Sequence, residues 1–459
     1  MSRYKTYPEY KNSGVKWLGK VPSHWSVSKV KYLTSFQVGW TPPTKDDGNF
    51  EGENLWANIS DLKEREIFDT NKKISDSAAK IASMEISPKG SLLYSFKLSV
   101  GTVSFAGKDM YTNEAIASFL EESKLPLSYL YYVLPKYLIE NASTNIYGAR
   151  ILNQELICNA DLIAPTFDEA QNVANFLDHE TAKIDVLIEK QQRLIELLKE
   201  KRQAVISYAV TKGLNPNAPM KDSGVEWLGE VPAHWVVARY KFCTSRILVG
   251  IAEAATHAYD ESGTPIIRST NIREEGLNQD GMLFIKKYFA EQVKSKYLYK
   301  DDIVTVRTGH PGISSVVPAS LDKSHCFTNL IATPLAKHTP QFLAEYLNSH
   351  IGKKYFELNA WGSAQKNISV PILQDFSIAY PERSEEENIE KYITSQKEKF
   401  TNLIARAENS ISLMQERRTA LISAAVTGKI DVRDWQAAAE PPTALNLKTH
   451  PDPSHERPS

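Results

Sequence analysis

The feature that most constrains the fold of this chain is a long amphipathic segment over residues 168–213. Residues seven apart form a series that is apolar except for one glutamine, with further leucines between its members. The series is Leu177, Ile184, Gln191, Leu198 and Val205, and the intermediate leucines are Leu187 and Leu194. This spacing predicts a helix with a narrow apolar seam, and such a seam needs a second helix to cover it. Asp168 can cap the start, and Gly213 ends the pattern. At ~1.5 Å per residue, the helix is a rod of roughly 65 Å.

A second copy of this segment supplies the partner. Residues 384–430 repeat the first helix at a shift of 216 positions, so that Glu200 recurs as Glu416 and Thr211 as Thr427. Two unrelated surface helices would share a period but not matched residues at their ends. The pattern therefore indicates an internal duplication, and the two helices are expected to pair as an antiparallel coiled coil.

A shorter repeat precedes each half of the chain. Residues 11–25 read KNSGVKWLGKVPSHW, and residues 221–235 read KDSGVEWLGEVPAHW. Tryptophan, glycine and proline at fixed places predict a compact, turn-rich plug with buried tryptophans. His24 and His234 could each ligate a metal, but neither has a second ligand at a supporting interval. The expected role is that of a packed or capping histidine.

The stretch after each plug predicts a globular domain of short strands, turns and helix. Alternating apolar residues such as Leu92, Tyr94 and Phe96 indicate strands with one exposed face. The same landmarks recur in the same order in both stretches, although the sequences between them differ almost completely. The landmark pairs are Gly39 and Gly250, Leu62 and Ile272, Gly101 and Gly312, Asn113 and Asn329, Gly148 and Gly362, and Asn153 and Asn367. The predicted class is therefore α+β.

The predicted organisation is a twice-repeated unit with a pseudo-twofold axis, in which each plug is followed by a globular domain and a long helix. Pairing of the helices would place the domains at opposite ends of one rod. The tail is rich in proline, alanine and polar residues and is predicted to be disordered. The predicted boundaries are 1–25 for the first plug, 26–167 for the first domain, 168–213 for its helix, 214–235 for the linker and second plug, 236–383 for the second domain, 384–430 for its helix and 431–459 for the tail.

Composition and missing motifs argue against most enzyme classes. The formal net charge is −1, so any DNA contact has to come from local patches. Three scattered cysteines without metal or disulfide spacing suggest a reducing compartment. A polar N-terminus and the absence of a long apolar run predict a soluble cytoplasmic protein without a membrane partner. No phosphate-binding loop, HExxH, CxxC, GxSxG or amino-methyltransferase box is present, so neither an active site nor a metal site is expected.

Two divergent surfaces that carry basic residues remain as candidate sites. Arginine and lysine can bind guanine edges, asparagine and glutamine adenine edges, and any cation a phosphate. Each residue alone is more simply a solvated surface residue, but as sets at corresponding points of two domains they indicate DNA reading. The candidates are Thr41, Lys45, Lys72, Lys73, Lys97 and Arg150 in the first domain and Arg268, Arg273, Lys286, Lys287, Arg307 and Lys366 in the second.

Taken together, these features resemble the specificity subunit of type I restriction-modification systems. The resemblance rests on the plug SGVxWLGxVPxHW, the GxTP stretch at 39–42, the pair Asn153–Gln154 and the matched helix ends, and it spans roughly residues 7–430. It implies two target recognition domains that each read one part of a split double-stranded DNA site, with the paired helices as a spacer. The second domain departs from this pattern after Gly250, where it reads IAEAAT and lacks the Thr-Pro dipeptide.

The resemblance also implies partner chains. Methylation and cleavage would belong to two methyltransferase subunits and to restriction subunits, so S-adenosylmethionine, ATP and Mg²⁺ are expected there and no cofactor on this chain. Two alternatives remain open: a coiled-coil adaptor that never reads DNA, and a self-sufficient methyltransferase or nuclease. The candidate docking residues at the matching helix ends are Arg202, Ile206 and Val210, with their mates Arg418, Ile422 and Val426.

Overall fold

A computed structural model describes residues 4–144, 150–251, 258–363 and 365–436. The chain forms two compact units, the first from residues 1–189 with 412–459 and the second from residues 190–411. Each unit contains one plug, one globular domain and a part of each long helix. Most of the IAEAAT sequence after Gly250 lies outside the described residues, so that departure has no structural account.

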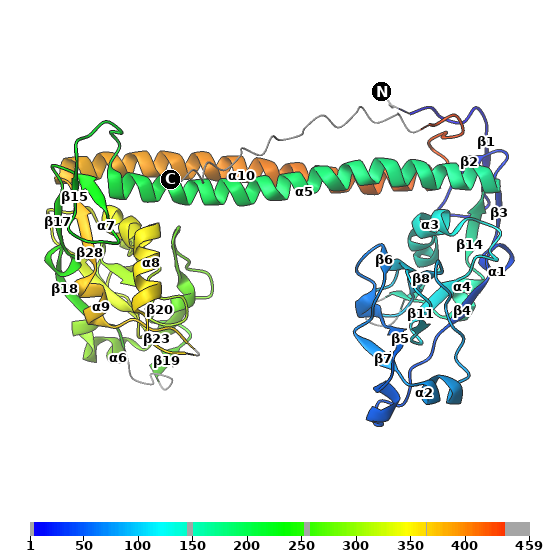
Figure 1. Ribbon diagram of the computed structural model, residues 1–459, viewed down its shortest axis with the longest axis horizontal. Coiled ribbons are helices and arrows are strands. Elements are labelled where there is room, and N and C mark those ends of the chain that lie inside the picture. Colours follow the sequence, from blue (N-terminus) through cyan, green and yellow to red (C-terminus); the bar gives the residue numbers. More distant parts are fainter. Residues whose placement is uncertain (1–3, 145–149, 252–257, 364, 437–459) are drawn as a thin grey trace, which may run out of the picture. The chain divides into compact units, whose positions relative to one another are not determined.

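The two long helices run antiparallel, as predicted. They are α5, Phe167–Lys212, and α10, Arg383–Val426. In the first unit the beginning of α5 packs against the end of α10, where Arg418 Nε lies 2.9 Å from Asp185 Oδ1. In the second unit Val210, near the end of α5, shares a buried core with Ile393, near the beginning of α10. The two helices lie side by side (Figure 1), although Leu187, Leu194 and Leu403 in the middle of the seams stay 50%, 43% and 37% exposed.

Each plug is a small hairpin attached to the first turn of a long helix. The hairpins are β1 (Tyr10–Asn12) with β2 (Lys20–Pro22), and β15 (Met220–Asp222) with β16 (Glu230–Pro232). The tryptophan that ends each plug is fully buried. His24 Nε2 lies 2.9 Å from Glu169 Oε2, and His234 Nε2 lies 2.8 Å from Glu385 Oε2. Both histidines thus pack against the start of a helix, as expected.

The first globular domain is a mixed fold around two sheets. Its elements are β3 (Ser26–Lys29), α1 (Val30–Leu33), β4 (Phe36–Val38), β5 (Asn54–Ala57), β6 (Glu66–Ile67), β7 (Lys72–Ile74), α2 (Asp76–Ile81), β8 (Leu92–Ser95), β9 (Val103–Ala106), β10 (Tyr111–Thr112), β11 (Ile116–Phe119), α3 (Leu127–Glu140), β12 (Ser143–Thr144), β13 (Arg150–Ile151), α4 (Gln154–Cys158) and β14 (Asp161–Ala164). The main sheet has the order β4-β11-β8-β9-β6, and the smaller one has the order β10-β5-β7. β3 pairs with β14, so the chain enters and leaves the domain on adjacent strands.

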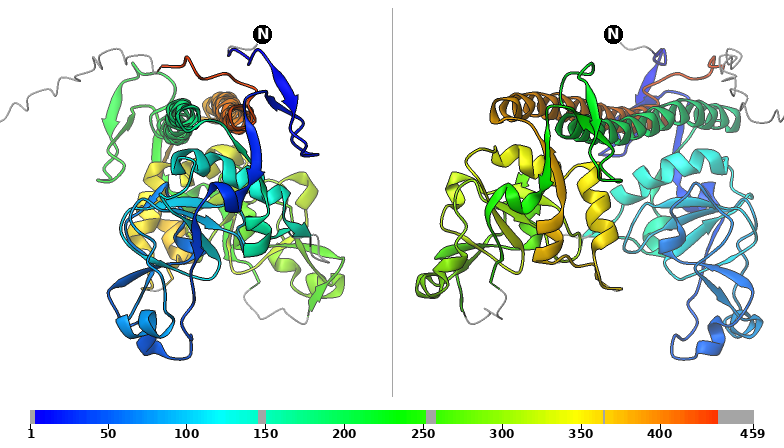
Figure 2. Two further views of the ribbon diagram at one scale, coloured as in Figure 1. Left: turned by 90° about the vertical axis from the view of Figure 1, so that its right-hand side faces the viewer. Right: turned by 60° about the vertical axis from the view of Figure 1, so that its left-hand side comes forward.

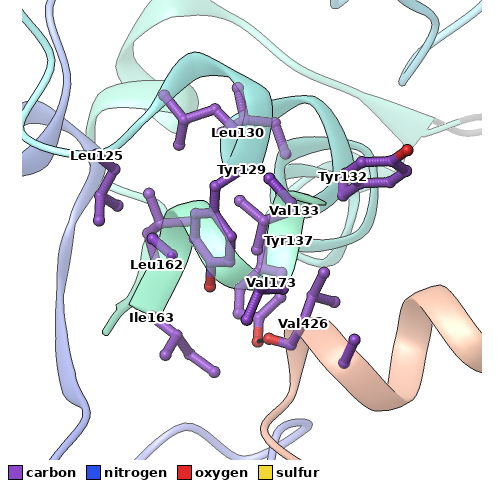
Figure 3. Packing of buried hydrophobic residues seen from close by; sticks show 14 of the residues in the cluster. Leu125, Tyr129, Leu130, Tyr132, Val133, Tyr137, Leu162, Ile163, Val173 and Val426 are labelled. Atoms are coloured by element: carbon purple, nitrogen blue, oxygen red, sulfur yellow. Dashed lines mark hydrogen bonds between the residues drawn. The ribbon is translucent and has the colours of Figure 1, made fainter. Parts of the chain in front are cut away.

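Helix α3 connects this domain to the long helices. Its apolar residues recur every three or four positions, so Tyr129, Val133 and Tyr137 lie on one buried face. Tyr137 Oη donates a hydrogen bond to the Val426 carbonyl at the end of α10, at 2.9 Å (Figure 3). The first core therefore contains residues of the plug, the domain and both long helices.

The second globular domain repeats this arrangement. Its elements are β17 (Val236–Arg239), β18 (Thr244–Val249), β19 (Tyr259–Asp260), β20 (Thr264–Ile267), β21 (Ile272–Arg273), β22 (Gly276–Leu277), β23 (Leu283–Ile285), α6 (Lys287–Gln292), β24 (Ile303–Thr305), β25 (Ser314–Val316), β26 (His325–Cys326), β27 (Leu330–Pro334), α7 (Pro340–Leu347), α8 (His350–Asn359), α9 (Val370–Asp375) and β28 (Ser377–Tyr380). The sheets have the orders β18-β27-β24-β25 and β19-β23-β20-β26, and β17 pairs with β28.

The turn between α7 and α8 contacts α5 in this unit. The Gln203 side chain donates to the Asn348 carbonyl at 2.8 Å, and the His350 N–H donates to Ser207 Oγ at 2.9 Å. The two short helices therefore lie between the long helix and the sheets (Figure 2). The predicted α+β class with two long helices is confirmed.

One backbone framework underlies both domains. At the end of the first strand of each main sheet, Gly39 N donates to Ile116 O and Gly250 N donates to Asn329 O. A Cβ at these glycines would lie 1.9 Å and 2.3 Å from a carbonyl oxygen of the adjacent chain segment, so no side chain fits at either place. The prediction that Gly39 and Gly250 occupy corresponding places is therefore confirmed.

The asparagine landmarks do not correspond in this framework. Asn113 N donates to Ala57 O, and at the matching place Phe327 N donates to Ile267 O. Asn329 occupies the place of Ile116 in the first domain. The prediction that paired Asn113 with Asn329 is therefore wrong, because the second domain has one residue fewer between the two hydrogen bonds.

The segment after α10 folds back onto the first unit. Val432 is buried, and the Trp435 ring lies 5.5 Å from the Phe176 ring on α5. The prediction of disorder from residue 431 is thus wrong for residues 431–436, because two large apolar side chains in this polar stretch find buried partners. Residues 437–459 lie outside the described residues.

Candidate nucleic-acid interface

Some of the predicted DNA-contacting residues of the first domain are exposed cations. Lys45 lies in the loop after β4, and Lys97 follows the end of β8. The described residues offer no carboxylate partner to either ammonium group. Lys72, on β7, lies over the Phe50 ring at 5.1 Å and is also exposed. These three side chains keep a charge that a phosphate could neutralise.

The other predicted residues of this domain already have partners within it. The Thr41 hydroxyl donates to the Glu114 carboxylate. Lys73 Nζ lies 3.4 Å from Glu53. Arg150 donates to the Ile139 carbonyl at 2.6 Å, at the end of α3. Arg150 in particular has a structural role in closing that helix end.

In the second domain, Arg273 and Lys287 are exposed, and no carboxylate in the described chain pairs with them. Lys286 is partly buried at the start of α6. Lys366 Nζ lies 3.4 Å from the Glu357 carbonyl, so it is engaged within the domain. Lys294, between α6 and β24, adds a further cation that was not among the predicted residues.

Arg268, Arg307 and Asn329 carry buried donors without acceptors. Arg268 Nη2 donates to Gly281 O at 3.2 Å, but the Nε donors of both arginines have no partner among the described residues. Asn329 is fully buried; its Oδ1 accepts from Ser269 Oγ at 2.8 Å, and its Nδ2 has no acceptor in the described chain. An unpaired buried donor is destabilising by about 1–3 kcal/mol.

The Arg307 and Asn329 donors lie at one end of the second domain's main sheet, and Ser269, next to Arg268, donates to Asn329 Oδ1. Thr305 pairs with Leu330, so Arg307 and Asn329 lie beyond the same end of neighbouring strands. A ligand with several acceptors, such as the guanine edge or a phosphate, would match spare arginine donors there. Sequence reasoning found both arginines but missed Asn329, whose only signal was its place directly before a buried strand.

The predicted sets do not lie at corresponding points of the framework. Gly101 N donates to Ser95 O and Gly312 N to Val306 O, which places Phe96 and not Lys97 at the position of Arg307. The strand pairing likewise matches β7, with Lys72 and Lys73, to β23 and not to Lys286 and Lys287, which follow β23. This part of the prediction is wrong because landmarks many residues apart do not define a strand register. The two domains instead present different chemistry at matching places.

A hollow of about 610 Å³ in the first domain does not fit a nucleic acid. Its lining includes Glu53, Asp69 and Asp109 against Lys73 and Lys108. The carboxylates would repel phosphates, so the exposed lysines outside the hollow remain the better anion-binding surface.

The structure contradicts most of the predicted partner-docking residues. Ile206, Val210 and Val426 are buried in the cores of their own units, and Ile422 packs against the first core. Arg202 pairs with Glu275 at 2.9 Å, and Arg418 holds α10 against α5. The repeated residues at the helix ends recur because they build equivalent cores, so a partner surface has to be sought among their exposed neighbours.

Among the described residues there is no group of three or more potential metal ligands, and no described helix is long and apolar enough to span a bilayer. Burial raises the pKa of the Cys243 and Cys326 thiols to about 12. Neither thiol therefore ionises near neutral pH, where only the thiolate is a good nucleophile.

Comparison with known proteins assigns this architecture to a family. Residues 22–198 match the type I restriction modification DNA specificity domain. The chain is 21% identical over 428 residues to the specificity subunit of the type I restriction enzyme MjaVIII from Methanocaldococcus jannaschii, which covers 90% of this chain and 95% of that subunit. The chain is therefore similar to the type I specificity subunits along most of its length.

Two further similarities agree with this assignment. The MjaIX specificity subunit of the same organism is 26% identical over 206 residues, so the match covers 44% of this chain and about half, 46%, of that relative. A solved chain, described as showing the structural basis of complex assembly and conformational transition of the type I R-M system, has a TM-score of 0.62 at 14% identity. It covers 89% of this specificity subunit and 99% of the solved chain, which supports the fold.

Proposed function

We propose that this specificity subunit reads a bipartite double-stranded DNA site, one part with each globular domain. Methyl transfer and DNA cleavage are carried out by methyltransferase and restriction subunits that assemble on it. Those partners bind S-adenosylmethionine, ATP and Mg²⁺, and the complex acts in the cytoplasm. Two methyltransferase subunits per chain are expected because the ends of the two long helices repeat.

The observation that carries this proposal is one framework with two different surfaces. Gly39 and Gly250 make the same backbone contact in both domains, yet the matching strands β7 and β23 carry Lys72 and Lys73 in one domain and Leu283 and Phe284 in the other. A purely structural adaptor has no need of two surfaces, whereas a reader of two unlike sequences requires them. The guanidinium groups of Arg268 and Arg307 belong to partly exposed side chains and can supply hydrogen bonds that base edges accept.

The test is to sequence the methylome of the source strain with the gene intact, deleted and restored. The proposal expects methylation at one split sequence that disappears on deletion and returns on complementation. Methylation that persists without the gene would overturn it. A band-shift assay with the purified partner subunits separates the alternatives, since an adaptor would give no sequence-dependent shift, and a self-sufficient methyltransferase would methylate DNA without partners.

A matched pair of variants tests the surface. Lys97 follows Ser95, which pairs with Ile116, whereas the exposed Lys124 follows the other end of β11. Replacing Lys97 by alanine should lower the salt dependence of DNA binding by about one unit of the log–log slope, because one phosphate contact is lost. Lys124→Ala should leave the slope unchanged. Equal slopes for both variants would remove Lys97 from the interface.

A further inference from the structure

The first unit covers an aromatic side chain of its long helix with both ends of the chain. Phe176 on α5 is fully buried. The Tyr4 ring stands edge-on to it at 5.3 Å, and the Trp435 ring does so at 5.5 Å. Trp435 also lies 5.3 Å from the His179 ring, one turn further along α5.

Hydrogen bonds hold these two terminal segments together. Asp431 N donates to Lys5 O at 2.9 Å, and Tyr10 Oη donates to the Gly428 carbonyl at 3.1 Å. Arg433 lies over the Tyr7 ring at 5.0 Å. The segments 4–10 and 428–435 thus form a cover, here called the terminal clasp, over the start of α5.

The equivalent place in the second unit has no such cover. The shift of 216 that relates the helices puts Tyr392 of α10 at the position of Phe176. Tyr392 is 37% exposed, Leu214 is 41% exposed and Tyr208 is 53% exposed. With Lys201 and Val205 among their neighbours, they line a hollow of about 430 Å³. Within the described chain, nothing fills it.

Chain connectivity explains the difference. In the first unit two separate segments, one before the plug and one after α10, meet over the helix. In the second unit α5 continues directly into the second plug through residues 213–219, so a single segment replaces two. The Tyr-Pro-Glu-Tyr leader at 7–10 also has no copy before the second plug. The second unit therefore presents the aromatic site without the residues that cover it in the first.

We propose that this hollow binds an aromatic side chain, next to a carboxylate, of a methyltransferase subunit. The covered site shows what fits: Trp435 follows Asp434 in the clasp, and Lys201 at the edge of the hollow can pair with such a carboxylate. The tail 437–459 contains no phenylalanine, tyrosine or tryptophan to fill the hollow. A second copy would have to release its own Trp435 from Phe176.

It follows that the two methyltransferase positions are unequal. The site in the second unit is open, whereas the site in the first is occupied by the terminal clasp, which a partner has to displace. The clasp is therefore an internal competitor that weakens binding of one of the two methyltransferase subunits. This inference rests on the proposed assembly with methyltransferase partners.

The test titrates the full chain with the methyltransferase subunit of the same system, by calorimetry and native mass spectrometry. The wild type should bind in two steps of different affinity. Tyr392→Ala should weaken the tighter step at least about tenfold, because central aromatic contacts dominate interface energies. Tyr32→Ala, at an exposed tyrosine of the first domain, should leave both steps unchanged. Trp435→Ala should tighten the weaker step by removing the competitor.

Each contrary outcome has a distinct meaning. Two equal steps in the wild type, or Tyr392→Ala with unchanged binding, would overturn the docking site while leaving the assembly intact. No binding by the wild type would refute the proposed assembly and this site together. Loss of self-association in Tyr392→Ala, seen by sedimentation without partner, would assign the hollow to a second copy instead. Urea unfolding of each variant checks that weakened binding is not loss of fold.

Discussion

Removal of the glutamate that links each plug to its helix should destabilise the two units unequally. Glu169 is 5% exposed and accepts from Tyr7 Oη at 2.7 Å, with His24 Nε2 at 2.9 Å. Glu385 holds the matching place, but its side chain is 34% exposed and its histidine, His234, is 55% exposed. Glu385 also accepts from Trp235 Nε1 at 3.1 Å, so each glutamate holds one histidine and one aromatic donor, in two degrees of contact with water.

The expected magnitudes follow from this burial. Hydrogen bonds to a charged group contribute about 1.5–3 kcal/mol each, and a buried hydroxyl left without a partner adds a penalty. After allowance for the desolvation of the carboxylate, Glu169→Ala should destabilise the first unit by about 3 kcal/mol. Glu385→Ala should destabilise the second unit by about 1 kcal/mol, because water competes for the hydrogen bonds of a side chain that is 34% exposed.

Hydrogen exchange by mass spectrometry in increasing urea is the suitable assay, since a two-unit chain has no single free energy of unfolding. Peptides from the buried strands β8 and β24 report the two units separately. Glu169→Gln keeps an acceptor for Tyr7 and should fall between wild type and Glu169→Ala. If Glu385→Ala destabilises its unit as much as Glu169→Ala does, the argument from burial is refuted.

Three further outcomes are expected. Exchange of residues 26–164 for the domain of a relative should change one half of the methylated site and keep the other, and a change in both halves would exclude independent reading. This range keeps the paired strands β3 and β14 together, whereas an exchange that ends at residue 160 would separate them. Inserting seven residues after Glu189 and after Ile411 lengthens each helix by ~10.5 Å while keeping the heptad phase. Methylome sequencing should then show the same two half-sites with up to about three more unread base pairs between them, and an unchanged gap in an active complex would contradict a spacer role. Burial lowers the pKa of His325, so the folded state favours the neutral ring. The free energy of unfolding of the second unit should therefore be independent of this group above the unfolded pKa of about 6.5 and fall by at most about 1.4 kcal/mol per pH unit below it. His325→Phe should remove this dependence.

Several features of this protein follow from the sequence alone. The two long helices, their antiparallel pairing, the plugs and the duplicated order of parts depend on local periodicity and on residues that repeat at a fixed shift. An apolar seam such as that of Leu177 and Ile184 is buried by packing against another helix, so the sequence pattern alone already predicts that the two long helices pair. The resemblance to the type I specificity subunits follows from the same repeats.

Tertiary structure decided which residues face solvent and which places correspond. Val210 and Val426 look like repeated surface residues in the sequence but lie in cores, because other elements cover their side of the helix. The register that aligns Arg307 with Phe96 depends on hydrogen bonds between strands far apart in the chain. Likewise, Phe176 is buried because the two segments of the terminal clasp meet over it, whereas its equivalent, Tyr392, is exposed because no such segments cover it. Neither the residue type nor its spacing in the sequence predicts this difference.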